Sequence, residues 1–553
     1  MRYGNFTPAC AYALRRTSFP VKCDTMTARG HLGGSKYQEG SNMKYIISHD
    51  IGTSSDKAVL VDFDGNIVAT VAEPYPTYYP APAHVEQDPN DYWKAVCITS
   101  KAVVAKAGIA PEDVKGIVFS TQAQGVIPVD EKGNNLMNNI TWVDGRAEEQ
   151  AQKIMNRLGG TKVFTLIVGT PIMGKDCVAK IAWVKEKRPE IYAKTKYFLD
   201  VNGWLKFKCT GEMYAELSGA SSYGLDLKKK SWMSAFPLIG VDMKRLPPLC
   251  KSTDMIGKGL TPKAAEETGL AVGTPVFGGC DDVQSAVVGS GMCGDGEVHI
   301  YLGTSAWVAA PSKTATKFMH GAAAIQSADP EMNLIAGITE AAGSNIQWIC
   351  DQFFKHEKAE LGEGIYEYMD SVIHNVPAGS DHLICTPWML GERCPVSSTT
   401  TRATLFNINP THTREHLMRA VYEGIAYNLR WILENYRKDY GFEGNNFRII
   451  GGGALDKGWM QIIADVTGCN FSVVKNPRNA GALGSAIIAL IGLGELKSFA
   501  DAKNFVQIEA KYKPDPANRA IYDKLFSDYK TLYAALRKPY IKANSRRFEG
   551  LEK

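Results

Sequence analysis

The sequence predicts an α/β protein built from two related halves, and three observations support this fold class. A strand, a Gly-Thr-Ser turn and a second strand open the ordered part of the chain. The same unit returns at residues 298–309, and a unit that repeats within one chain indicates a duplicated architecture. In the second half, an amphipathic helix precedes a strand, a glycine turn and a further helix.

The first half opens with an apolar strand at residues 45–47 that leads to Asp50 and to the turn at residues 52–55. Residues 57–63 (KAVLVDF) form the next strand, and the tight turn at residues 64–65 leads to a third. Apolar runs joined by such turns predict strands paired through hairpins.

Two further apolar runs follow in this half. Residues 116–120 (GIVFS) end in the polar loop TQAQG, and residues 126–129 precede another turn, so we expect both to extend the same sheet. The glycine-rich stretch at residues 289–296 (GSGMCGDG) suits a hinge between the halves. We therefore predict three parts: a disordered extension at residues 1–42, an N-terminal domain at 43–292 and a C-terminal domain at 293–553.

The second half starts with residues 298–302 (VHIYL), which run into the turn Gly303-Thr304-Ser305. Apolar residues recur every four positions later in this half, which predicts an amphipathic helix packed on a sheet. The elements expected there are, in order, this helix at residues 414–438, a strand at 447–450, the glycine turn Gly451-Gly452-Gly453 and a helix at 457–466.

Composition and charge exclude several classes of protein. Hydrophobic residues make up 45% of the chain and charged residues 22%, so a packed core is expected. The net charge of +4 arises in the first 42 residues, and the rest carries equal numbers of basic and acidic side chains. A neutral body without a Lys/Arg stripe argues against a nucleic-acid partner.

The first 42 residues show no sustained helical or strand period. Their basic character leaves two interpretations open, an organelle-targeting segment or a loose extension, and the thin apolar face favours the second. The twelve cysteines contain no CxxC pair, which indicates reduced thiols and a cytoplasmic location. The longest weakly polar run, residues 481–494, is too short to span a bilayer, so we expect no membrane partner.

Each Gly-Thr-Ser turn offers backbone N–H groups and hydroxyls in a small concavity that can hold a phosphate. An ordinary polar hairpin is the better explanation of a single such turn. Two copies at equivalent places favour a clasp for a polyphosphate, and Asp50, just before the first turn, could hold Mg²⁺ through water.

Two adjacent acids, Asp281 and Asp282, follow a predicted strand and precede a helical run. Either one of them caps the helix, or one is a general base that accepts the proton of a substrate hydroxyl.

Three consecutive glycines at residues 451–453 are costly in backbone entropy, so we expect a flat group such as adenine or ribose against them. The chain lacks GxGxxG, GxxxxGKS and GxSxG, so dinucleotide-binding, P-loop and serine-hydrolase families are not supported.

These motifs, in this order, resemble those of the FGGY carbohydrate kinases, and most closely the xylulokinase branch. The resemblance runs over nearly all of residues 45–493. The matching segments are DIGTSSDK (50–57), VEQDPNDYW (85–93), WVDGR (142–146), KIAWVKEKRPE (180–190), GGCDD (278–282), YLGTS (301–305), GERCP (391–395) and IGGGALDKGWMQIIADVTG (450–468).

The resemblance implies two ribonuclease H-like domains of the actin-like ATPase type around a central cleft, with ATP and Mg²⁺ between them. It assigns Asp281 as the catalytic base and Asp50 to the metal. By the same resemblance, ATP would lie against Thr53, Ser54, Gly303, Thr304, Gly452, Gly453 and Gln461, and the sugar against Gln122, Gln124, Trp142 and Asp282.

The resemblance implies an ATP-dependent kinase for a terminal hydroxyl of a ketopentose, with D-xylulose favoured. Gln124 stands where xylulokinases usually carry His, and Asp282 where they carry Asn, so ribulose, erythritol and gluconate stay open as acceptors. A rival is a non-transferring actin-like ATPase switch, which Asp281 and its sugar-facing neighbours disfavour. The expected partners are a small sugar and ATP, and a homodimer is left open.

Overall fold

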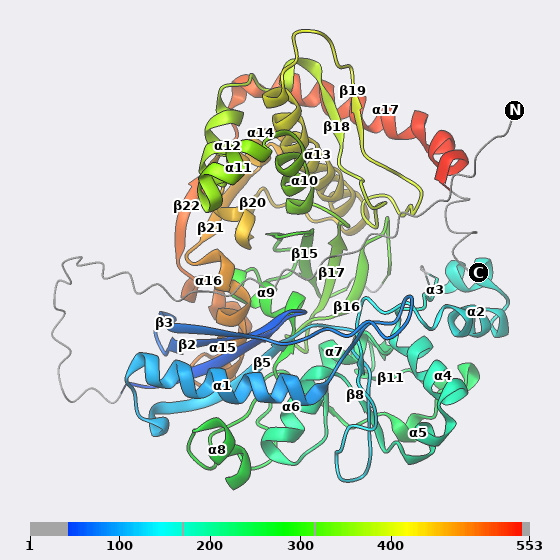
Figure 1. Ribbon diagram of the computed structural model, residues 1–553, viewed down its shortest axis with the longest axis vertical. Helices are drawn as coiled ribbons and strands as arrows, with labels where there is room; N and C mark the ends of the chain where they lie inside the picture. The colour runs from blue at the N-terminus through cyan, green and yellow to red at the C-terminus, as the bar shows by residue number, and fades with distance from the viewer. Residues whose placement is uncertain (1–42, 169–170, 315–316, 545–553) are drawn as a thin grey trace, which may run out of the picture. The chain divides into compact units, whose positions relative to one another are not determined.

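The computed structural model describes residues 43–168, 171–314 and 317–544, and its two main β-sheets are surrounded by helices (Figure 1). The first sheet has the strand order β13-β5-β1-β2-β3. Strands β1, β2 and β3 are antiparallel neighbours, β5 runs parallel to β1, and β13 runs parallel to β5. Their bounds are β1 (Tyr45–Ile51), β2 (Ser55–Asp62), β3 (Ile67–Pro74), β5 (Val114–Thr121) and β13 (Cys280–Asp281).

The second sheet has the order β16-β17-β15-β14-β20-β21-β22. Its strands are β14 (His299–Leu302), β15 (Ala306–Ser312), β16 (Ala323–Gln326), β17 (Asn333–Ile338), β20 (Asn446–Ile450), β21 (Asn470–Val474) and β22 (Ile508–Tyr512). Strands β14, β15 and β17 are antiparallel, and β20 and β21 continue in parallel, as β5 and β13 do in the first sheet. Three antiparallel strands followed by two parallel ones therefore occur twice, which confirms the duplicated α/β fold.

Both faces of the first sheet are covered. Successive residues of β1 belong to different cores: Ile47 packs in the cluster that contains Tyr92 of α1 (Pro89–Ala107), whereas Ile46 packs in the cluster that contains Ile487 of α15 (Ala480–Gly492). Figure 1 shows α1 lying along this sheet. Because successive side chains of a strand point to opposite faces, covering both faces buries every residue of β1 except the partly exposed Asp50.

Two helices cross between the halves. Helix α9 (Asp282–Ser290) follows β13 and α15 follows β21, so they are equivalent elements of the two repeats. They pack on one another, and α15 also contacts β1 and β5 of the opposite half. Glycine is required at this crossing, because a Cβ at Gly289 would lie 1.7 Å from Ala480 O, and one at Gly484 would lie 1.9 Å from Ser285 O.

The amphipathic helix predicted in the second half is α13 (Arg414–Tyr440). It ends at Gly441, whose φ of 71° is the left-handed conformation that glycine adopts readily. The Tyr436 hydroxyl donates to Val308 O of β15 at 2.7 Å, so the helix packs on the second sheet as expected.

The remaining helices are α2 (Glu148–Arg157), α3 (Thr161–Val168), α4 (Cys177–Lys187), α5 (Pro189–Lys194), α6 (Val201–Thr210), α7 (Leu217–Ser221), α8 (Pro262–Thr268), α10 (Gly343–Phe353), α11 (Lys355–Leu361), α12 (Ile365–His374), α14 (Lys457–Thr467), α16 (Ala502–Phe505) and α17 (Arg519–Asn544). Within the ranges that the structure describes, no helix combines the length and the apolar character needed to cross a bilayer.

One expectation about the first sheet is wrong. Residues 126–129 do not extend it: β6 (Ile127–Val129) pairs with β8 (Tyr197–Leu199) in a separate two-stranded sheet. The physical reason lies in the loop after β5, where Gln124 has a φ of 59° and redirects the chain. The domain limits at residues 292 and 293 stay a prediction, and residues 1–42 lie outside the described part of the chain.

Candidate active site

The first Gly-Thr-Ser turn joins β1 to β2 and is held by its own backbone. The Gly52 N–H donates to Ser55 O at 3.1 Å, and the Tyr75 hydroxyl donates to Gly52 O. Thr53 and Ser54 are exposed. The turn therefore presents two hydroxyls on a fixed backbone, as a phosphate site requires.

The second turn repeats this arrangement between β14 and β15. The Gly303 N–H donates to Ser305 O at 2.9 Å, and Thr304 is exposed. Helix α10 starts against it: the N–H groups of Gly343 and Ser344 donate to the carbonyls of residues 303 and 304 at 3.0 and 3.1 Å. A Cβ at residue 343 would lie 2.5 Å from Gly303 O. Sequence reasoning missed this support, whose signal was a Gly-Ser pair before a helical run.

Two of the three glycines at residues 451–453 are explained by packing. A Cβ at Gly451 would lie 2.3 Å from Leu302 O, and one at Gly453 would lie 2.6 Å from the Trp459 ring. At Gly452 the nearest outside atom would be a guanidinium nitrogen 3.7 Å away. The glycine turn thus packs against Leu302, the last residue of β14. Gly452 is the position at which an added Cβ would have free space.

Asp281 is both a helix cap and a buried acid. Its Oδ1 accepts the Gln284 N–H at 3.0 Å at the start of α9, and its side chain is 5% exposed. Burial, with smaller contributions from Glu216 and Asp200, raises its pKa to about 7. The capping alternative is therefore confirmed for Asp281. The base role is compatible with it, because a carboxylate with a pKa near 7 is well matched to accept a proton at neutral pH.

Asp50 and the acid pair lie at one edge of the first sheet. In the sheet register Asp50 is opposite Ser120, and Asp281 is opposite Thr121, the next residue of β5. The loss of hydration within the site, together with the charges of Asp281 and Asp50, raises the pKa of Asp282, although part of this residue reaches solvent. The carboxyl ends of the parallel strands β1, β5 and β13 thus bring the predicted base and the predicted metal residue to the same edge, with β5 between them.

Two of the predicted sugar residues, Gln122 and Trp142, contact the first turn. Gln122 is buried, its amide nitrogen donates to Gln87 Oε1 at 2.9 Å, and its Oε1 has no hydrogen-bond partner among the described residues. The Trp142 indole N–H donates to Thr53 Oγ1 at 3.1 Å, which ties this side chain to the phosphate turn. Gln124 is partly exposed on the left-handed backbone described above.

Gln461 is not linked to these groups by its contacts. Its side-chain nitrogen donates to Asp465 Oδ1 at 2.7 Å and to Lys513 O at 2.8 Å. Both partners lie in its own helix or just after β22. A role of Gln461 beside adenosine stays a prediction.

The acids at this edge fit a magnesium ion that is only partly held by protein. Among the described residues, no three His, Cys, Asp or Glu side chains form a preformed metal cage. Mg²⁺ normally takes one or two carboxylates together with substrate phosphates and waters. Asp50 suits this role, since its side chain is partly exposed and, within the described ranges, its one ion pair is with Lys57 Nζ at 3.0 Å.

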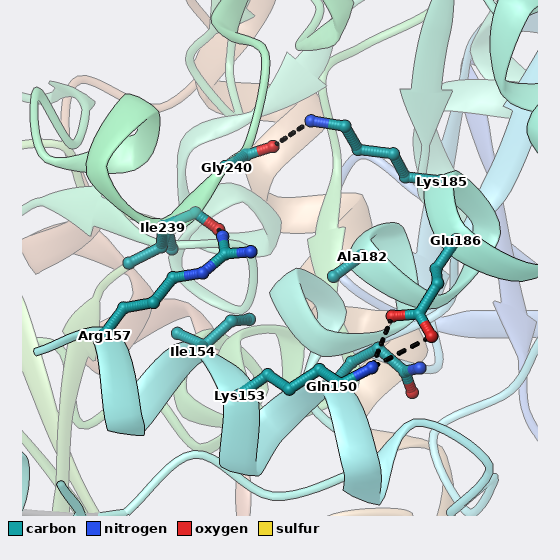
Figure 2. Close-up of a pocket in the computed structure, with 9 residues that line it drawn as sticks. All are labelled: Gln150, Lys153, Ile154, Arg157, Ala182, Lys185, Glu186, Ile239 and Gly240. Atoms are coloured by element: carbon teal, nitrogen blue, oxygen red, sulfur yellow. Dashed lines mark hydrogen bonds and ion pairs between the residues drawn. The ribbon is translucent and has the colours of Figure 1, made fainter.

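A cavity of about 230 Å³ lies elsewhere, between α2, α4 and the loop at residues 239–240 (Figure 2). Three of its charged side chains are engaged, because Lys153 pairs with Glu186 at 3.0 Å and Lys185 donates to Gly240 O at 2.8 Å. The side-chain nitrogen and oxygen of Gln150, by contrast, have no hydrogen-bond partner among the described residues. None of the nine residues labelled in Figure 2 is a predicted site residue. The cavity is therefore separate from the turns and acids described above.

Comparison with known proteins identifies the family. The models of the N-terminal and C-terminal domains of the FGGY family of carbohydrate kinases match residues 45–289 and 298–493. A xylulose kinase of Bacillus subtilis is 29% identical and covers 89% of this chain and 97% of its own. A gluconokinase of that bacterium is 28% identical and covers 90% and 97%. The crystal structure of xylulose kinase from Rhodospirillum rubrum matches with a TM-score of 0.81 at 26% identity, over 90% of this chain and 100% of that one. Because the two family models match most of the chain, this protein belongs to the FGGY family of carbohydrate kinases.

Proposed function

We propose that this carbohydrate kinase transfers the γ-phosphoryl group of ATP to a terminal hydroxyl of a ketopentose, with D-xylulose as the first candidate. The observation that carries the proposal is the position of Asp281 at the strand edge that also holds Asp50 and the first Gly-Thr-Ser turn. Similarity to xylulose kinases supports the choice of acceptor.

Asp281 acts as the general base in this proposal. Its carboxylate takes the proton of the acceptor hydroxyl while that oxygen forms a bond to the γ-phosphorus and the bond from phosphorus to the ADP oxygen breaks. The cap bond to Gln284 fixes the carboxylate before the sugar arrives. Fixing the base in advance removes part of the entropic cost of bringing the reacting groups together.

The two turns and Asp50 position the nucleotide. Thr53, Ser54 and Thr304 supply exposed hydroxyls, and the start of α10 holds the backbone of the second turn in place. A bound Mg²⁺ would neutralise the charge that develops on the phosphates. In this proposal Gln122, whose buried oxygen has no hydrogen-bond partner among the described residues, accepts a hydrogen bond from a sugar hydroxyl.

A sugar acid is the second candidate, because a gluconokinase is nearly as similar as the xylulose kinase. The adjacent carboxylates of Asp281 and Asp282 disfavour it, since they would repel the carboxylate of an aldonic acid.

The test is steady-state ADP release with D-xylulose, D-ribulose, erythritol, gluconate or no acceptor. We expect release that depends on a ketopentose, with the highest kcat/KM for D-xylulose. Preference for gluconate would replace the proposed acceptor. Equal release with and without acceptor would favour an ATPase switch instead.

A further inference from the structure

Lys180 in helix α4 is a buried cation that the proposed reaction does not use. Its side chain is 0% exposed, and its Nζ donates to Gln124 O and to Thr141 O, each at 2.8 Å. A charge buried in protein is costly unless it is well hydrogen-bonded. Burial lowers the pKa of Lys180, as expected for a desolvated ammonium.

The two carboxylates near Lys180 already interact with other groups. Asp144 pairs with Arg146 at 2.7 Å, and Asp176 Oδ2 accepts the Met173 N–H at 2.8 Å. The ammonium is thus directed at two backbone carbonyls from separate segments of the chain.

Both carbonyls belong to segments that carry predicted sugar contacts. One is the carbonyl of Gln124 itself, whose left-handed backbone is unfavourable for a residue with a side chain. The other precedes Trp142, whose indole reaches the first phosphate turn. The Gln124 segment has a second anchor, because the Tyr223 hydroxyl donates to Gly125 O at 2.6 Å.

We propose that Lys180 is a positioning residue that sets acceptor selectivity by holding the Gln124 and Trp142 segments in one arrangement. This inference rests on the proposed function, because it takes these two side chains to face the sugar. Helix α4 presents Ala182, Lys185 and Glu186 to the cavity of Figure 2, whereas Lys180 is buried against the two loops. Helix α4 therefore holds in place the Gln124 and Trp142 segments, which the proposal takes to line the acceptor site.

The test measures kcat/KM of the full-length enzyme for two acceptors, one that it phosphorylates efficiently and one that it phosphorylates slowly. Lys180→Met removes the ammonium and keeps an unbranched side chain of similar length. We expect the ratio of kcat/KM between the two acceptors to fall about tenfold, which is the effect of one lost hydrogen bond to a charged group, while the KM for ATP stays within about twofold. A purely structural role would leave this ratio unchanged, because the ratio does not depend on how much enzyme is folded.

Val184→Ala is the matched control. Val184 lies in the same helix, is fully buried and contacts neither carbonyl through a hydrogen bond. It should lower the melting temperature and leave the acceptor ratio unchanged. If Lys180→Met does not fold, Lys180→Gln keeps a polar donor that is too short to reach both carbonyls, and the same fall in ratio is expected.

Hydrogen exchange of the backbone amides tests the same inference without any acceptor. Exchange in residues 121–126 and 139–144 should become faster in Lys180→Met and not in Val184→Ala. Unchanged exchange in both segments, or an unchanged acceptor ratio, would overturn the inference. A wild-type enzyme that phosphorylates no sugar would refute the proposed function, and the exchange data would still decide whether Lys180 holds the two segments.

Discussion

Asp281→Asn should make the protein more stable at alkaline pH and nearly inactive. The substitution keeps the size of the side chain and a good helix cap, since Asn and Asp cap helices about equally well. It removes a carboxylate that burial places in an unfavourable environment. Activity and stability should therefore change in opposite directions.

The magnitude follows from the pKa. The pKa of Asp281 is raised from 3.8 to about 7, and each pKa unit corresponds to about 1.4 kcal/mol. The ionised side chain then costs at most about 4 kcal/mol of folding free energy above pH 7. The adjacent Asp282 also has a raised pKa, so part of this free-energy cost belongs to the pair and remains in the variant. A neutral Asn also lacks the attraction between a carboxylate and the helix dipole, which is worth about 0.3–1 kcal/mol. We expect a net gain in stability of about 2–3 kcal/mol.

The sign depends on pH. Between about pH 4 and pH 7 the folded protein keeps a proton on Asp281 that the unfolded chain has released, so wild-type stability falls as the pH rises. The Asn variant has no such loss. The difference in melting temperature should thus be near zero at about pH 4 and reach its full value at about pH 8.

Calorimetry at both pH values, together with ADP-release kinetics and nucleotide binding, measures the outcome. We expect kcat to fall by about 10²–10⁴ while the dissociation constant for ATP changes little. A lower melting temperature at pH 8, or a gain that is the same at both pH values, would refute the account of the buried carboxylate. Loss of turnover in Asp282→Asn but not in Asp281→Asn would exchange the roles of the two acids.

Three other variants test separate parts of the site and fold. Asp50→Asn should raise the Mg²⁺ concentration needed for half-maximal activity, because it removes a charge that would attract the metal; an unchanged Mg²⁺ titration would argue against this role. Gly289→Ala should destabilise the protein by about 3 kcal/mol or more, because its Cβ would overlap Ala480 O and force two helices apart; thermal unfolding at the wild-type temperature would contradict the observed crossing. Gln124→His combined with Asp282→Asn should shift the ranking of acceptors towards D-xylulose if the native acceptor is another sugar, and an unchanged ranking would show that these side chains do not contact the acceptor.

Much of the fold could be predicted because its signals are local. The strand, Gly-Thr-Ser, strand unit is visible twice in the sequence, and its two copies occupy equivalent places in the two sheets. The partner of a short strand is not a local property. Residues 127–129 are apolar, but they pair with β8, far along the chain, because the backbone at Gln124 leads away from the first sheet.

In the candidate site, too, the sequence indicates the features with local signals and misses those that depend on contacts between distant residues. The residue types of Asp50 and Asp281 indicated chemistry, and the sheet register brings them to one edge. Gln122, which the family resemblance alone assigned to the sugar, directly follows β5. The glycine turn was interpreted through its entropy alone, whereas Gly451 is required by contact with Leu302, a residue of another strand. Lys180 begins the segment KIAWVKEKRPE that carries the family resemblance, but its role was not indicated, because its partners are backbone carbonyls, which every residue possesses.

The products of the reaction test the central claim most directly. Full-length enzyme is incubated with ATP, Mg²⁺ and D-xylulose, and the phosphorus-containing products are identified by NMR and mass spectrometry. The account predicts ADP and a pentulose monophosphate in equal amounts, formed about 10²–10⁴ times more slowly when Asp281→Asn replaces the wild type. ADP accompanied by inorganic phosphate, with the sugar unchanged, would contradict it.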